Sequence, residues 1–157
     1  MTWNYLASSG EYSDFQEIAH SLKNLVKQDR LMDDGLEYSA KDLANYAGES
    51  NKTASIMYKK RSDMNPLWNY NVIAGAKNGQ AYLGIVDMYG NKFESSSVSS
   101  GIARHFIGPL ISNYYNENFD ENQAKQFLYE AFKTFYARYK LSGNKFKNVN
   151  IGCRSLL

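Results

Sequence analysis

The apolar residues of this chain change their spacing from one stretch to the next, and the spacing predicts local structure. From Ser13 they recur at steps of three and four residues, which indicates the buried face of an amphipathic helix. Asp33, Asp34 and Gly35 end the pattern, and Gly35 suits the left-handed position that follows a helix. A lone helix cannot bury such a face, so it must lie on a flat apolar surface. The face consists of Phe15, Ile18, Ala19, Leu22, Leu25 and Val26.

Two strand-length apolar runs, residues 72–76 and 81–86, lie on either side of Asn78 and Gly79. Both runs are rich in residues that suit a pleated sheet. Asn and Gly tolerate the positive φ angles of a two-residue type I′ turn, so the pair predicts a β-hairpin whose register is fixed at the turn. A second tight turn is expected to return the chain along residues 92–94. The centre of the chain is therefore predicted to be a three-stranded antiparallel meander.

The stretch before this meander predicts one strand and one interrupted helix. Residues 3–8 are mostly apolar or aromatic and short, as expected of a strand. Ser39 is expected to cap a helix, with Asp42 as the reciprocal partner of a capping box. Residues 48–53 are poor helix formers, so they should interrupt this helix or bulge out as a loop before it ends in three cations, residues 59–61.

The stretch after the meander predicts two more helices and a last strand. Residues 95–101 are polar and avoid helix, so we expect a linker. Pro109 is expected to kink the third helix, and Asp120 with Gln123 to cap the fourth. Residues 146–151 predict the strand. The predicted apolar faces are Ile102, Phe106, Leu110 and Ile111 in the third helix, and Ala124, Phe127, Leu128, Ala131 and Phe135 in the fourth.

The resulting order, β-α-α-β-β-β-α-α-β, places the helices in pairs around antiparallel strands. Each pair must cover a sheet face to bury its apolar residues, which predicts a layered α+β domain. The chain has 157 residues, a length typical of one domain, and shows no internal repeat. Residues 1–157 are therefore predicted to form a single domain.

Composition excludes several classes of protein. Apolar residues make up 43% of the chain and charged residues 22%, as in an ordinary soluble globular protein. No apolar run approaches the roughly 20 residues of a membrane span, and the first residues do not resemble a signal peptide, so we expect the cytoplasm and nucleus. The single cysteine, Cys153, excludes a disulfide framework and a multi-cysteine zinc site. A net charge of +2 is too small to predict nucleic-acid binding.

The side chains that could carry chemistry are scattered along the chain. His20 and His105 lie on different predicted helices without a second ligand near either, so we expect no metal site and no cofactor site. Asp33, Asp34 and Glu37 cluster in one turn, where carboxylates are usually solvated. Paired acid–base catalysis by these carboxylates is the weaker interpretation.

Two further possibilities are an RNA site and a threonine nucleophile. The cations of residues 59–61 could contact RNA phosphates while Tyr58 stacks on a base, although cations at a helix end more often cap and solvate it. Removal of Met1 would expose Thr2, whose amine could activate its own hydroxyl. Such a nucleophile needs a preorganised lysine and an oxyanion hole, and no lysine precedes Lys23. The residues therefore favour no catalytic role.

Five stretches of the chain form a set that is found in one protein family. They are Ser9–Gln16, Met57–Ser62, Met64–Asn69, Tyr82–Gly90 and Gly108–Leu110. In this order and register they resemble proteasome beta subunits, most closely the non-catalytic kind that fills the seventh beta place of the core ring. The resemblance extends over about residues 7–151, and the Met-Asn-Pro-Leu-Trp run is specific to that kind of subunit.

The resemblance implies an N-terminal-nucleophile fold, a four-layer αββα sandwich within the α+β class. Against that pattern the chain would be incomplete, because the N-terminal strand pair and the C-terminal strand have no counterpart. Residues 152–157 stand where the last strand's partner would be, and residues 48–53 match nothing in the pattern. We therefore expect a shortened gene product or an incomplete gene model, with unpaired sheet edges.

Three departures from active members imply that this chain does not cleave peptides. The N-terminal threonine and lysine of active subunits are absent. Arg104 stands where active subunits have a supporting serine in a Gly-Ser-Gly-Ser run. Residues 138–142 keep a serine, Ser142, and lose the aspartate of active subunits. The resemblance thus implies no catalytic residue, no cofactor-binding residue and no metal ligand.

The implied function is that of a structural subunit, which fills one place in the 20S proteasome ring during ubiquitin-dependent protein degradation. Its partners would be other alpha and beta subunits, without nucleic acid or membrane. The first helix pair would face the alpha ring and the last pair the opposite beta ring. The fourth helix is aromatic on all sides, so one face would serve a partner: Phe127, Tyr129, Phe132, Phe135, Tyr136 and Tyr139. An active threonine hydrolase or a small RNA-binding module is the alternative.

Overall fold

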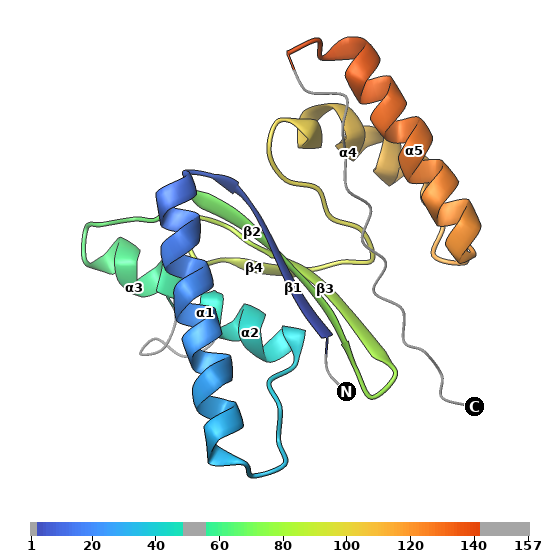
Figure 1. Cartoon of the computed structure of the whole chain (residues 1–157). Coiled ribbons are helices and arrows are strands. Elements are labelled where there is room, and N and C mark those ends of the chain that lie inside the picture. Colours follow the sequence, from blue (N-terminus) through green and yellow to red (C-terminus); the bar gives the residue numbers. More distant parts are fainter. Residues whose placement is uncertain (1–2, 49–55, 142–157) are drawn as a thin grey trace. The chain divides into compact units, whose positions relative to one another are not determined.

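The computed structural model describes residues 3–48 and 56–141 (Figure 1). The described elements are β1 (Trp3–Gly10), α1 (Tyr12–Met32), α2 (Ala40–Ala47), α3 (Ile56–Ser62), β2 (Asn69–Lys77), β3 (Gln80–Val86), β4 (Lys92–Glu94), α4 (Ala103–Tyr114) and α5 (Glu121–Arg138). This mixture of helices and antiparallel strands confirms the predicted α+β class. The predicted strand over residues 146–151 lies outside the described residues.

The described chain falls into two compact units, one reaching Val98 and one starting at Ser99. The first holds the sheet with α1 to α3, and the second holds α4 and α5. The expectation of a single domain over residues 1–157 stays a prediction. None of the helices described is both long and apolar enough to cross a membrane.

Four antiparallel strands form one sheet in the order β1, β2, β3, β4. Lys77 pairs with Gln80 across the hairpin turn, as predicted. Asn78 and Gly79 have φ angles of 51° and 81°, both positive as a type I′ turn requires. The predicted meander is therefore confirmed, and β1 extends it by pairing with β2.

The first helix lies on the sheet through the predicted apolar face (Figure 1). Ile18 and Leu22 are buried, and Leu25 and Val26 pack beside them. The predicted cap is wrong, because Asp33 rather than Gly35 occupies the left-handed position directly after α1, with a φ of 47°. Aspartate tolerates this conformation because its short side chain can bond locally.

The second helix begins at the predicted capping box. The Asp42 N–H donates to Ser39 Oγ at 3.2 Å, and the Ser39 N–H donates to Asp42 Oδ2 at 2.9 Å. Gly48 is the C-cap of α2, so the predicted interruption starts there, while residues 49–55 lie outside the described residues. The cations of residues 59–61 fall in the last turn of α3, as predicted.

The core of the first unit lies between α1, α2 and one face of the sheet. Leu6, Ile73, Tyr82 and Val86 point from the strands into this layer. Gly75 lies directly under α2, since a Cβ at Gly75 would come within 2.7 Å of Ala40 Cβ and 2.4 Å of the Trp3 carbonyl oxygen. The helices contribute Ile18, Leu22, Ala40, Leu43, Ala44, Ala47 and Met57 to this core.

The opposite face of the same sheet is also apolar. Side chains alternate along a strand, so the register places a second row of residues away from α1 and α2. Trp3 and Phe93 in this row are 49% and 57% exposed. The row comprises Trp3, Tyr5, Ala7, Val72, Ala74, Leu83, Ile85 and Phe93. In the first unit, the described helices therefore cover one of two apolar faces.

The second unit is a pair of helices with a small core of Ile107, Ala131 and Phe135. The Asp120 N–H donates to Gln123 Oε1 at 3.0 Å, which confirms the cap of α5. Two predicted core residues are wrong, because Ile102 is 53% and Leu128 40% exposed. Ile102 precedes the first residue of α4 and so lies off its packed face. On α5 that face is centred on residues 131 and 135, which lie four apart.

The linker of residues 95–101 contains neither helix nor strand, as predicted. Pro109 lies inside α4, and the predicted kink there stays a prediction.

Replacing Gly75 should destabilise the first unit. The Gly75→Ala methyl would overlap Ala40 and the Trp3 carbonyl, and such overpacking costs about 1–3 kcal/mol. Gly108→Ala is the matched control, because a Cβ on this helical glycine would meet only Ser99 Oγ, at 3.7 Å. It should be neutral or stabilising by up to about 1 kcal/mol. Urea unfolding of both variants checks this, and equal midpoints would contradict it.

The capping box should make stability depend on acid. Burial raises the pKa of Asp42, but the bonds from the Ser39 hydroxyl and N–H, with Lys77, outweigh it and hold the pKa below its usual range. A carboxylate with a lowered folded-state pKa stabilises the fold above its unfolded pKa, and this contribution is lost as the pH falls through the folded pKa. Asp42→Asn keeps an acceptor oxygen without the titration. We expect the free-energy difference between wild type and Asp42→Asn to shrink below about pH 4, and a constant difference in urea titrations from pH 6 to 3 would refute it.

Candidate functional site

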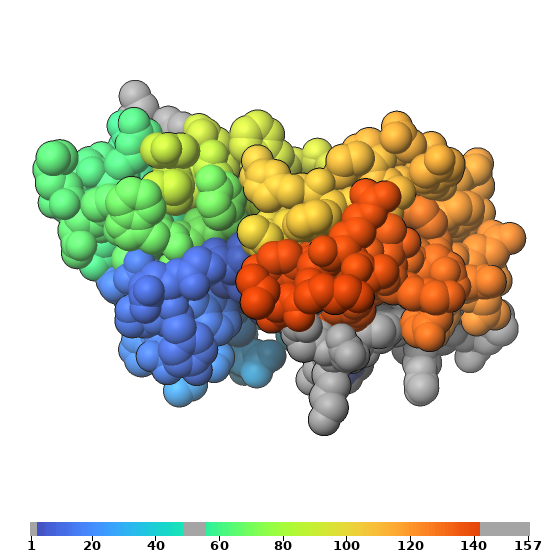
Figure 2. Space-filling view, turned by 90° about the horizontal axis from the view of Figure 1, so that it is seen from above, coloured from blue at the N-terminus to red at the C-terminus, as the bar shows by residue number. Residues whose placement is uncertain are grey.

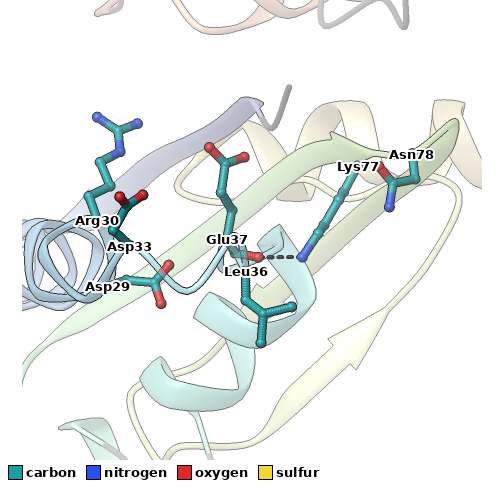
Figure 3. A pocket seen from close by; sticks show the side chains of 8 residues that line it. Asp29, Arg30, Asp33, Leu36, Glu37, Lys77 and Asn78 are labelled. Carbon is teal, nitrogen blue, oxygen red and sulfur yellow. Dashed lines mark hydrogen bonds between the residues drawn. The ribbon is translucent and has the colours of Figure 1, made fainter.

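An open hollow of about 470 Å³ lies between the end of α1, the loop after it and the β2–β3 turn (Figure 3). Its charged groups support the loop. Asp29 Oδ2 accepts the Tyr38 N–H at 3.1 Å, and the Lys77 ammonium donates to the Glu37 carbonyl oxygen. Within residues 3–48 and 56–141, no three His, Cys, Asp or Glu side chains are grouped so that they could hold a metal ion. The hollow is lined by Asp29, Arg30, Asp33, Gly35, Leu36, Glu37, Lys77 and Asn78.

The carboxylates proposed for acid–base work lie in or beside this loop. Asp34 Oδ1 accepts the Leu36 N–H at 2.9 Å, which closes a local turn. Asp33 occupies the left-handed cap of α1, and Glu37 offers its carbonyl to Lys77. The contacts of Asp34 and Glu37 thus fix the course of the backbone.

A second hollow, of about 460 Å³, lies between the start of α2 and β3. Tyr82 on its wall is 9% exposed, and its hydroxyl has no hydrogen-bond partner among the residues described. Burial, and then the charge of Glu94, raise the pKa of Tyr82, so the phenol stays protonated at neutral pH. Lys41 pairs with Glu94 at 3.3 Å on the rim. The hollow therefore offers no activated nucleophile in the part of it that is described.

The cations considered for RNA binding are partly engaged within the chain. Lys60 Nζ lies 2.5 Å from Glu17 Oε1, and this bond raises the pKa of Lys60. The Arg61 guanidinium carbon lies 5.4 Å from the centre of the Tyr89 ring, a cation–π contact. These contacts weaken the RNA-binding interpretation.

The other candidate residues are not brought together in what the structure describes. His20 is exposed on α1, with Nε2 2.9 Å from Asn24 Nδ2 one turn further on. His105 is exposed on α4 in the second unit. Thr2, Ser142 and Cys153 lie outside the described residues, so their predicted roles stay predictions.

The loop of residues 63–68 is fixed to the start of α1 by a set of contacts that we name the clasp. Asp14 Oδ2 accepts the Trp68 N–H at 2.9 Å, and the Glu11 N–H donates to the Trp68 carbonyl oxygen at 3.2 Å. Gly10 completes the clasp, since a Cβ there would come within 2.0 Å of that oxygen. Only a glycine fits, and its φ of 133° suits a glycine.

Exposed aromatic and apolar side chains surround the clasp. We name four of them the platform: Tyr12, 68% exposed; Met64, 90%; Trp68, 61%; and Tyr89, 49%. Figure 2 shows the blue start of α1 beside the green atoms of α3 and the following loop. Sequence analysis missed the platform, because side chains in loops follow no period. The signal that could have found it is a Met and a Trp on a Pro-marked loop.

The proteasome subunit family matches residues 4–151. Proteasome subunit beta type-4 of Dictyostelium discoideum is 34% identical over 145 residues, which are 91% of this chain and 54% of the relative. The protein of the same name from Arabidopsis thaliana is 34% identical over 146 residues, 93% of this chain and 57% of the relative. The protein of this name from Xenopus laevis is 31% identical over 148 residues, which are 93% of this chain and 59% of the relative.

This chain therefore spans a little over half the length of these relatives. The predicted resemblance to proteasome beta subunits is confirmed, since the match extends over most of this chain and joins its two described units in one family pattern. The chain belongs to the proteasome subunit family.

Proposed function

We propose that this chain is a structural, non-catalytic beta subunit of the 20S proteasome core, which contributes to ring assembly for ubiquitin-dependent protein degradation. The family match over residues 4–151 is the observation that carries this proposal. The relatives named beta type-4 support the position in the beta ring. The partners would be other alpha and beta subunits, and the location the cytoplasm and nucleus, which imaging of a tagged chain would test.

The second apolar face of the sheet supports the four-layer αββα sandwich as the complete fold. Val72, Leu83 and Ile85 lie on this face, opposite the layer formed by α1 and α2. A sheet that is apolar on both faces is stable only when both are covered. In the proposed sandwich a second sheet covers this face.

The non-catalytic role is supported by the side chains where active members carry their catalytic support. Arg104, a bulky cation exposed in the first turn of α4, stands in place of a serine. At the first hollow, the carboxylates of Asp29 and Asp34 accept backbone N–H groups.

One charged substitution on the second sheet face can test both the assembly of the chain into the particle and the four-layer sandwich. The tagged chain, purified natively from its source cell, should co-migrate with other proteasome subunits identified by mass spectrometry. Val72→Asp should fall out of that particle, because an unpaired carboxylate buried between sheets costs several kcal/mol.

Gln80→Asp is the matched control, since it adds the same charge at an exposed position of the neighbouring strand. It should assemble like wild type. Equal recovery of Val72→Asp and Gln80→Asp would contradict the four-layer sandwich. Recovery of the wild type as a lone monomer would contradict the proposed role as a ring subunit.

The absence of catalysis can be tested at Thr2. If this chain is non-catalytic, Thr2→Ala should leave the turnover of fluorogenic peptides by the purified particle unchanged, within about twofold. An active N-terminal threonine would instead lose its nucleophile, and turnover at its site would fall by a factor of about 10³ or more. Specific loss of one peptidase activity would therefore favour the threonine hydrolase.

A further inference from the structure

The platform is held in place by the fold. The clasp ties Trp68 to the start of α1 through its N–H and its carbonyl oxygen. The Lys60–Glu17 pair joins α3 to α1, and the Arg61–Tyr89 contact joins α3 to the turn before β4. Each segment that carries a platform residue is thus bonded to another. A surface ordered in advance loses little entropy when it binds.

Met64 is held in an unusual conformation. Its φ of 57° lies in the left-handed region, although methionine has no side chain that stabilises it there. The Met64 N–H donates to the Arg61 carbonyl and the Asn65 N–H to the Lys60 carbonyl, so the end of α3 fixes the turn. Met64 is 90% exposed in this conformation, so its side chain does not contribute to the hydrophobic core. Such strain is typical of binding and switch regions.

The composition of the platform is that of a binding surface. Trp, Tyr, Met and Arg are enriched in protein interfaces, and Trp and Tyr dominate among the residues that carry their energy. Each aromatic side chain buries about 150–250 Å² when covered. Leaving two tyrosines, a tryptophan and a methionine in water therefore sacrifices free energy that a partner can recover.

The charges around the platform identify the class of partner. Lys60 is paired with Glu17, and Arg61 stacks on Tyr89. Asp14 accepts the Trp68 N–H, and Asp87 accepts the N–H groups of Tyr89 and Asn91. Each of these groups is engaged within the chain, and groups of both signs surround the platform, so the matching surface is apolar at its centre. A polyanion such as RNA does not complement it, whereas a recess on a folded protein does.

We infer that the platform docks into an apolar recess on a neighbouring subunit of the proteasome particle. The inference rests on the proposed function, which supplies the neighbour. The inference adds the surface that contacts this neighbour. Trp68 and Met64 are the side chains that insert into the recess, and the clasp holds the loop that carries them. This surface is distinct from the apolar sheet face, because its residues lie on α1, the loop of residues 63–68 and the β3–β4 turn.

Photo-crosslinking of the assembled particle tests the contact directly. Trp68 is replaced by benzoylphenylalanine, an aromatic residue of similar size, in the tagged full-length chain expressed in its source cell. After irradiation of the purified particle, mass spectrometry should show residue 68 joined to another proteasome subunit. Crosslinks only within the same chain, or only to a protein from outside the particle, would overturn the inference.

Truncation of the inserted side chains gives the second measurement. The double variant Met64→Ala/Trp68→Ala should lower recovery in the particle about tenfold or more. Its thermal unfolding should match wild type, because both side chains are exposed in the free chain. The matched control is Leu31→Ala/Met32→Ala, which removes two side chains that are 84% and 77% exposed at the other end of α1.

The two proposals fail in different ways. If wild type is recovered in the particle and Met64→Ala/Trp68→Ala is recovered equally well, the platform is not the docking surface and the proposed function stands. If wild type is not recovered with any proteasome subunit, the proposed function fails and the inference fails with it.

Discussion

The sheet of the first unit is apolar on both faces, and the burial of these two faces is the constraint on which the rest of the fold depends. Ile73, Tyr82 and Val86 bury one face against α1 and α2, where Gly75 lets α2 approach the backbone. Side chains alternate along each strand, so the geometry that builds this core also builds the opposite row around Val72 and Ile85. An apolar sheet face that is left in water promotes aggregation, so this row of residues favours a covering layer.

The second unit requires further apolar surface for a different reason. Its two helices bury few residues against each other, with Ile107, Ala131 and Phe135 at the centre and the rings of Phe106 and Tyr139 packed around Phe135. Two helices with so small a core are marginal in water, because helix stability in proteins comes mostly from packing. This helix pair therefore needs apolar contacts beyond its own small core to be stable.

The polar groups of the described chain work mainly to position its backbone. Asp42 caps α2, Asp34 closes a turn, and Asp14 holds the loop that presents Trp68. A carboxylate that accepts backbone N–H groups gains charge-assisted hydrogen bonds, which fix the backbone segment that donates them. The same backbone contacts hold the loop around which the exposed platform lies.

The features that could be predicted from the residues alone are those that depend on neighbours along the chain. Asn78 and Gly79 themselves tolerate the positive φ angles of their turn, and the capping box of Ser39 and Asp42 closes within one turn of helix. Three features became visible only in the folded chain: β1 pairs with β2, Ile107 rather than Ile102 is buried, and Asp14 accepts the Trp68 N–H. The reason is physical: a turn or a cap needs only adjacent residues, whereas pairing, burial and the clasp depend on which distant surfaces meet once loop-closure entropy has been overcome.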